Sequence, residues 1–116
     1  MANRVFAALA VALAITNLAF AHAVLLKATP APHGLVTGPD IDIDLQFNSR
    51  IDSTRSRLIL VLPDHTTRSI SLQPSSTPAS IGARLTGLSA GEYTLRWQVL
   101  AADGHITRGE IPFQVK

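Results

Sequence analysis

The residues best suited to chemistry in this sequence are its four histidines, and His22 has the most unusual position among them. If the chain is cut after Ala21, His22 becomes the first residue, and its α-amine and ring Nδ1 can close a six-membered chelate on a metal. The α-amine has a pKa of about 7.7 to 8.0, so a metal can displace its proton near neutral pH. Amine and imidazole nitrogens suit Cu(II). The sequence therefore predicts a Cu(II) site at His22.

A further nitrogen ligand is available in Asp103-Gly104-His105. Side chains two residues apart point the same way in extended backbone, and Gly104 leaves room for a metal beside them. We therefore expect Asp103 and His105 to complete the site. The alternative is a plain Asp-Gly hairpin turn with an exposed histidine, because Asp-Gly is a common turn sequence. His33 and His65, in "TPAPHG" and "LPDHTT", are expected to be solvated loop histidines.

The segment before His22 has the three parts of a secretory signal peptide. Arg4 precedes an uncharged apolar run, and the run ends in the small-x-small sequence Ala19-Phe20-Ala21. We expect residues 1–21 to be removed and residues 22–116 to form one exported, periplasmic domain. An uncleaved membrane anchor is the alternative, but the run of about 17 residues is at the lower limit for a span.

The composition of residues 22–116 excludes several classes of function. Nine basic and eight acidic residues nearly balance, so there is no basic stripe for nucleic acid to bind. The chain has no cysteine, so disulfides cannot stabilise the domain and a sheet core must do so. We also expect no small-molecule substrate and a monomeric protein.

Alternating apolar and polar residues predict the elements that position these side chains. "IDIDLQF" and "GEYTLRWQVL" each put apolar residues on one face and polar residues on the other. About seven such strands without an amphipathic helix indicate an all-β, immunoglobulin-like sandwich. Tyr93 follows a turn and is expected to form a tyrosine corner. The predicted strands cover residues 24–28, 41–47, 57–62, 66–72, 80–85, 91–100 and 110–116.

Three stretches resemble the CopC copper-resistance family of periplasmic copper proteins: "HAVLLKATPAPHG", "IDIDLQF" and "LSAGEYTLRWQVLAADGHITRGEIPFQV". The likeness covers nearly all of residues 22–116. It implies a seven-stranded Greek-key β-sandwich, a cupredoxin-like barrel, that holds one Cu(II) in a histidine brace. The ligands it implies are the His22 amine and Nδ1, a His105 imidazole nitrogen and the Asp103 carboxylate.

The sequence departs from that family at two places. Some members carry a Cu(I) site in a methionine-rich segment, where this chain has "LPDHTTRS" with His65 and no methionine. Cu(I) prefers thioether or thiolate ligands, so we expect a protein that binds Cu(II) alone. Some members place a glutamate after the phenylalanine of the second strand, but Asn48 follows Phe47 here. We expect no ligand from that position, and water can substitute.

The resemblance favours a periplasmic Cu(II) carrier or sequestering protein in copper homeostasis or resistance, with no catalytic residue. It implies that copper passes to an inner-membrane transporter of the CopD type. One alternative is a copper oxidase of the lytic polysaccharide monooxygenase type, which needs exposed aromatic residues. The aromatic residues from His22 onward, Phe47, Tyr93, Trp97 and Phe113, all occupy predicted core positions. A second alternative is a metal-free, immunoglobulin-like adaptor.

Overall fold

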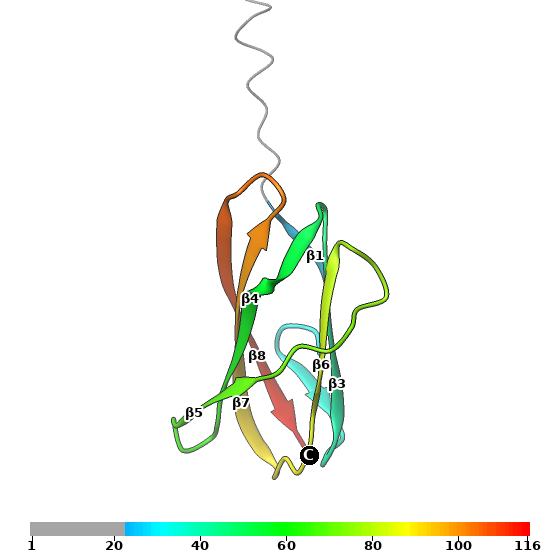
Figure 1. The fold of residues 1–116 in the computed structure, drawn as a ribbon. Helices are drawn as coiled ribbons and strands as arrows, with labels where there is room; N and C mark the ends of the chain where they lie inside the picture. Colours follow the sequence, from blue (N-terminus) through cyan, green and yellow to red (C-terminus); the bar gives the residue numbers. More distant parts are fainter. Residues whose placement is uncertain (1–22) are drawn as a thin grey trace, which may run out of the picture.

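The computed structural model describes residues 23–116, which form eight β-strands and no membrane-spanning helix. The predicted signal peptide and His22 lie outside the described residues. The predicted all-β class is confirmed, and the strands are arranged as two facing sheets (Figure 1). The strands are β1 (Leu25–Thr29), β2 (Gly34–Val36), β3 (Ile41–Phe47), β4 (Ile51–Val61), β5 (Thr67–Ile70), β6 (Ser80–Leu85), β7 (Gly91–Ala101) and β8 (Ile106–Val115).

One sheet has the strand order β1-β3-β6, and the other has the order β2-β8-β7-β4-β5. All neighbouring strands run antiparallel except β2, which pairs in parallel with the end of β8. β2 is the strand that the sequence did not predict. It has three residues, too few to display alternation, and its partners on β8 lie far along the chain.

The core lies between the sheets and follows the alternation of the sequence. In β3 and β7, the residues predicted to point inward are buried. Phe47 and Trp97 meet edge to face with ring centroids 5.3 Å apart, and Tyr93 stacks on Phe113 at 5.6 Å. All four aromatic side chains of the described residues are buried, as predicted. The Tyr93 hydroxyl donates a hydrogen bond of 2.8 Å to the Ser89 carbonyl, which confirms the tyrosine corner.

β4 begins six residues earlier than the sequence predicts because its first part is bulged and polar. The pairing of β4 with β7 shifts register between Asp52 and Arg57. Ser56 stabilises this irregular segment, since its hydroxyl donates to the Asp52 carbonyl at 2.7 Å and accepts from the Leu100 amide at 3.1 Å. The bulge lets β4 stay paired with β7 up to the hairpin that joins β7 to β8.

Three segments meet at one end of the sandwich: the start of β1, the β3–β4 connection and the β7–β8 hairpin (Figure 1). The β4–β5 turn and the carboxyl terminus lie at the opposite end. Asp103 and His105, the predicted copper ligands that the structure describes, therefore lie at the first end, and His65 lies at the second.

Candidate metal centre

The β7–β8 hairpin is a tight turn closed by backbone hydrogen bonds. The Ala101 amide donates to the His105 carbonyl at 2.9 Å, and the Gly104 amide donates to the Ala101 carbonyl at 2.9 Å. Gly104 has φ +88°, a conformation that residues with a side chain rarely adopt. The glycine therefore allows the chain to reverse between Asp103 and His105.

This turn brings Asp103 and His105 together. The His105 amide donates to Asp103 Oδ1 at 2.9 Å, and His105 Nδ1 lies 3.0 Å from Asp103 Oδ2. The Asp103 side chain is 27% exposed and that of His105 is 53% exposed. The hairpin is thus also the Asp-Gly turn that the sequence offered as an alternative, and the same turn aligns the two side chains.

The contact between carboxylate and imidazole has a chemical consequence. A carboxylate on one ring nitrogen fixes the tautomer and orientation of a histidine. Here Asp103 engages Nδ1, so a metal would bind His105 through Nε2. The pair resembles the usual support of a metal-binding histidine.

Asn48 holds the first described residues against the β3–β4 connection. The Val24 amide donates to Asn48 Oδ1 at 2.8 Å, and the Asn48 amide donates to the Val24 carbonyl at 3.1 Å. Ala23, just before this contact, is 1% exposed. His22 itself is outside the described residues.

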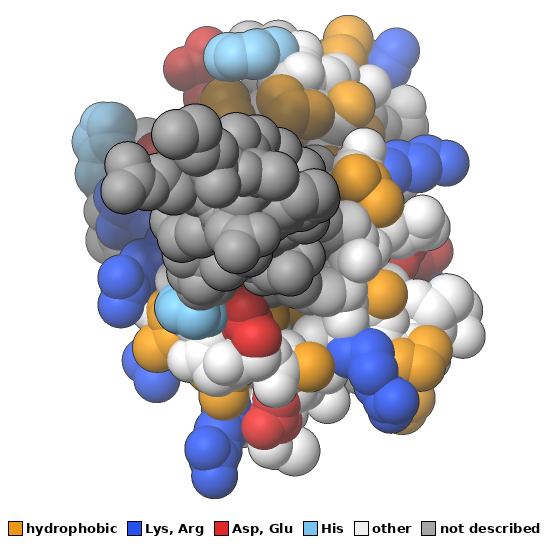
Figure 2. Space-filling view, turned by 90° about the horizontal axis from the view of Figure 1, so that it is seen from above, with side chains coloured by type: hydrophobic (Ala, Val, Ile, Leu, Met, Phe, Trp, Pro, Cys, Tyr) orange, Lys and Arg blue, Asp and Glu red, His pale blue; other side chains and the backbone are white. Residues whose placement is uncertain are grey.

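The β3–β4 connection also contacts the hairpin, since the Ala102 amide donates to the Arg50 carbonyl at 3.0 Å. One short segment, residues 48–50, thus makes backbone contact with both the start of β1 and the β7–β8 hairpin. Figure 2 looks down on this end of the molecule and shows histidine, acidic and basic side chains at its surface.

Asn48 is a functional candidate that the sequence did not indicate. It was expected only to lack the ligand that some family members carry at this position. The structure gives it a different role, because its amide oxygen binds the backbone at Val24, 24 residues away. No pattern of residue types predicts a hydrogen bond of this kind.

His33 and His65 lie exposed in loops, as predicted, and they share both a hollow and a left-handed backbone conformation. Both line a hollow of about 510 Å³ at the other end of the sandwich, together with Glu92. Both also have left-handed backbone, with φ 61° and 69°. Across residues 23–116, no three His, Cys, Asp or Glu side chains are arranged to hold a metal ion. The described residues alone therefore do not complete a metal site at either end.

The sequence of the chain decides its family. The model of the CopC domain matches residues 25–116. The chain belongs to the CopC family. Among its relatives, copper resistance protein C of Xanthomonas campestris pv. juglandis is 29% identical over 106 residues, which are 84% of this chain and 83% of that protein. Protein YobA of Escherichia coli K12 is 29% identical over 107 residues, which are 88% of this chain and 85% of that protein.

Solved structures of CopC-type proteins share the fold. CopC from Methylosinus trichosporium OB3b has a TM-score of 0.73 at 21% identity and matches 82% of this chain and 94% of its own. PcoC from Escherichia coli, a methionine-rich copper resistance protein, has a TM-score of 0.68 at 25% identity and matches 83% of this chain and all of its own. The likeness confirms the Greek-key sandwich, and membership of this family implies copper binding.

Proposed function

We propose that residues 22–116 form a periplasmic Cu(II) carrier that binds one copper ion between the amino terminus at His22 and the β7–β8 hairpin. The observation that carries the proposal is the pair of contacts made by residues 48–50. Asn48 binds Val24, two residues beyond His22, and Arg50 binds the hairpin that bears Asp103 and His105. These contacts support a site assembled from both segments.

The proposed ligand set follows from the chemistry of each group. Cleavage after Ala21 creates the α-amine, which binds copper with the His22 Nδ1, and His105 binds through Nε2. Asp103 holds the His105 ring at 3.0 Å and adds a negative charge that favours the divalent ion. It takes the fourth position or leaves that position to water. Because every nitrogen ligand must be deprotonated, copper binding releases protons and weakens in acid.

The proposed cargo is Cu(II) alone. The single methionine of the chain is Met1, and there is no cysteine, so residues 22–116 have no soft sulfur ligand for Cu(I). PcoC is described as methionine-rich, and this chain differs from it in that respect.

We assign the protein to transport or sequestration of copper in homeostasis or resistance, without a catalytic role. A copper oxidase acting on polysaccharide needs an exposed aromatic platform, but the aromatic side chains of residues 23–116 are all buried. An inner-membrane transporter of the CopD type is the proposed recipient of the metal, and the carrier is proposed to act as a monomer.

Titration of the protein that begins at His22 with Cu(II) tests this function. We expect one equivalent to bind, with an electron paramagnetic resonance spectrum of nitrogen-rich tetragonal Cu(II) and quenching of Trp97 fluorescence. The absence of stoichiometric binding would contradict a copper carrier. Release of oxidised sugars from a polysaccharide in the presence of ascorbate and peroxide would contradict the absence of catalysis.

A further inference from the structure

The outward face of the five-stranded sheet has a hollow of about 300 Å³ that is lined by neither Asp103 nor His105. Three arginines surround it, one from each of three neighbouring strands: Arg57 on β4, Arg96 on β7 and Arg108 on β8. The hollow is also lined by Ile59, Trp97, Gln98, Gly109 and Glu110. We call this feature the arginine hollow.

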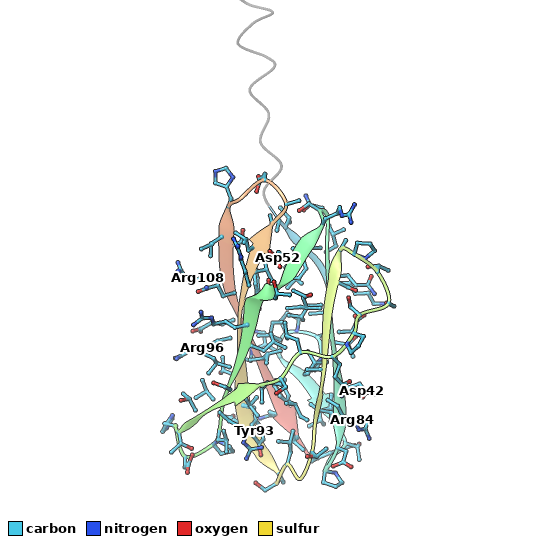
Figure 3. All side chains as sticks on the ribbon, viewed as in Figure 1. Asp42, Asp52, Arg84, Tyr93, Arg96 and Arg108 are labelled. Carbon is cyan, nitrogen blue, oxygen red and sulfur yellow. The ribbon has the colours of Figure 1, made fainter. Side chains whose placement is uncertain are left out.

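The strand register fixes the spacing of the arginines. Arg57 lies opposite Gln98, and Gln98 lies opposite Arg108. Residues in direct register point to the same face, and neighbouring strands are about 4.8 Å apart, so the Cα atoms of Arg57 and Arg108 are about 10 Å apart. Arg96, two residues before Gln98, is on the same face. Figure 3 shows Arg96 and Arg108 extending from this side of the sandwich.

Among residues 23–116, one of the three guanidinium groups has a carboxylate partner. Arg96 Nε bonds Glu110 Oε1 at 3.1 Å. Arg108 Nε donates instead to the neutral Gln98 side chain, with 2.8 Å to Oε1, and Arg57 forms no ion pair with any residue of the part that the structure describes. The other sheet is different, since its Arg84 pairs with Asp42 at 2.7 Å and with Asp40 at 3.9 Å. The arginine hollow therefore has positive charge that the described part of the chain does not neutralise.

One part of the hollow is apolar. Gly109 and Trp97 line it from within the sheet: Gly109 lies opposite Trp97, and a Cβ at Gly109 would overlap the Trp97 ring on the inner, buried side of the sheet. Ile59 on the neighbouring strand adds an apolar side of the hollow. A small apolar side chain can enter here while charged groups reach the surrounding arginines.

We propose that the arginine hollow binds an extended acidic segment of a partner protein. Guanidinium groups bind carboxylates through paired hydrogen bonds and charge. In an extended segment, residues four apart lie about 13 Å from each other on one face. Two acidic residues at that spacing can reach Arg57 and Arg108. The residue midway between them lies over Gln98, with Ile59 of the same hollow beside it. The pattern recognised is acidic–x–apolar–x–acidic.

The shape of the hollow favours a protein segment over a membrane surface. Binding to a bilayer needs apolar side chains that protrude into it. The large apolar side chains that are exposed in the described residues, Val24, Leu26, Leu35 and Ile106, do not line the hollow. A hollow that is apolar in part and lined by charged groups instead fits one side chain of a peptide.

The peptide SESLSES, in which two glutamates flank a leucine at alternate positions, is the probe. Nuclear magnetic resonance titration of the ¹⁵N-labelled protein that begins at His22 should show saturable shifts at Gln98, Arg108 and their neighbours on β4. We expect binding to be about 3- to 10-fold weaker in each of Arg57→Gln and Arg108→Gln, because each removes one charged contact. Arg68→Gln, on β5 and outside the hollow, should leave binding unchanged.

Two further arms separate the outcomes. SKSLSKS, with lysine in place of glutamate, should not bind. Sedimentation with vesicles rich in phosphatidylglycerol should not exceed that with neutral vesicles. No saturable shifts with SESLSES, equal loss in Arg68→Gln, or binding to anionic vesicles alone would overturn the proposal. Peptide binding should be the same with and without Cu(II). A protein that binds no peptide would therefore contradict the arginine-hollow proposal and leave the copper-carrier proposal untouched.

Discussion

Two turns at opposite ends of the sandwich are stabilised by the same kind of hydrogen bond, from a backbone N–H to an aspartate side chain. In the β4–β5 turn, Asp64 Oδ1 accepts the backbone N–H of Thr66 at 3.0 Å. In the β7–β8 hairpin, Asp103 Oδ1 accepts the backbone N–H of His105 at 2.9 Å. In both turns, a carboxylate thus binds the amide two residues later, and the middle residue has left-handed backbone.

The turns differ in which residue occupies each place. In the β4–β5 turn the middle residue is the histidine, His65. The Asp64 carboxylate accepts a hydrogen bond of 2.6 Å from the Thr66 hydroxyl. In the hairpin, Gly104 is the middle residue and His105 is the third, so Asp103 Oδ2 lies next to the His105 ring. A shift of the histidine by one position therefore decides whether the turn presents a supported imidazole.

The largest difference between the turns should appear when each histidine is removed. We expect His105→Ala to weaken Cu(II) binding by about 100- to 10,000-fold, the usual contribution of a linked second binding group. His65→Ala is the matched control and should bind copper like the wild type. Competition titration against a chelator of known affinity measures both. An equal loss of Cu(II) affinity in the two variants would contradict a specific role for His105.

Removing the charge of Asp103 should also weaken copper binding, by less than the loss of His105, whereas removing the charge of Asp64 should not. Asp103→Asn keeps an acceptor for the His105 amide but removes the negative charge beside the ring. We expect copper affinity to fall about 10- to 100-fold, as when the support of a ligand is lost. Asp64→Asn should leave it unchanged. Wild-type affinity in Asp103→Asn would contradict a role for this carboxylate at the metal.

The end of the sandwich that carries the β7–β8 hairpin also has the hydrogen bond between Val24 and Asn48. We expect Asn48→Ala to weaken copper binding by about 10-fold, the lower range for groups that position ligands, and to speed hydrogen exchange at the Val24 amide. Asn48→Asp keeps the acceptor oxygen and should retain slow exchange. Faster exchange with unchanged copper affinity would show that this hydrogen bond serves only the fold.

The smallest effect concerns the carboxylate of the β4–β5 turn. The hydroxyl and then the backbone amide of Thr66 stabilise the ionised form of Asp64 and lower its pKa from the ordinary 3.8. A lowered pKa stabilises the folded state above pH 3.8, and this contribution disappears as the pH falls through the folded pKa. Thr66→Val should raise the pKa of Asp64, measured by carbon NMR titration of the carboxyl group. An unchanged pKa would contradict this cause.

The elements that alternation predicts are those with strong local patterns. β3 and β7 were predicted at or within one residue of their observed ends because each alternates throughout. β2 and the first part of β4 were missed, since one is a three-residue parallel pairing with a distant strand and the other is polar and bulged. Local pattern does not encode pairing of that kind.

The candidate site likewise has features that local sequence predicts and features that it does not. The sequence predicted that Asp103 and His105 lie on the same side of an extended segment, whereas the structure brings them together through a turn at Gly104. The hydrogen bond from Val24 to Asn48 joins residues 24 apart, and the hollow shared by His33 and His65 joins two separate loops. Both depend on tertiary contacts. The arginine hollow likewise depends on register across three strands.

The most direct test of the copper site compares two proteins that differ only before His22. One begins at His22, and the other carries one additional alanine, which turns the α-amine into an amide nitrogen. We predict that the extended protein binds Cu(II) about 100- to 10,000-fold more weakly, because one arm of the chelate is lost, with fewer nitrogen couplings in its electron paramagnetic resonance spectrum. Equal affinity and identical spectra in the two proteins would contradict ligation by the amino terminus.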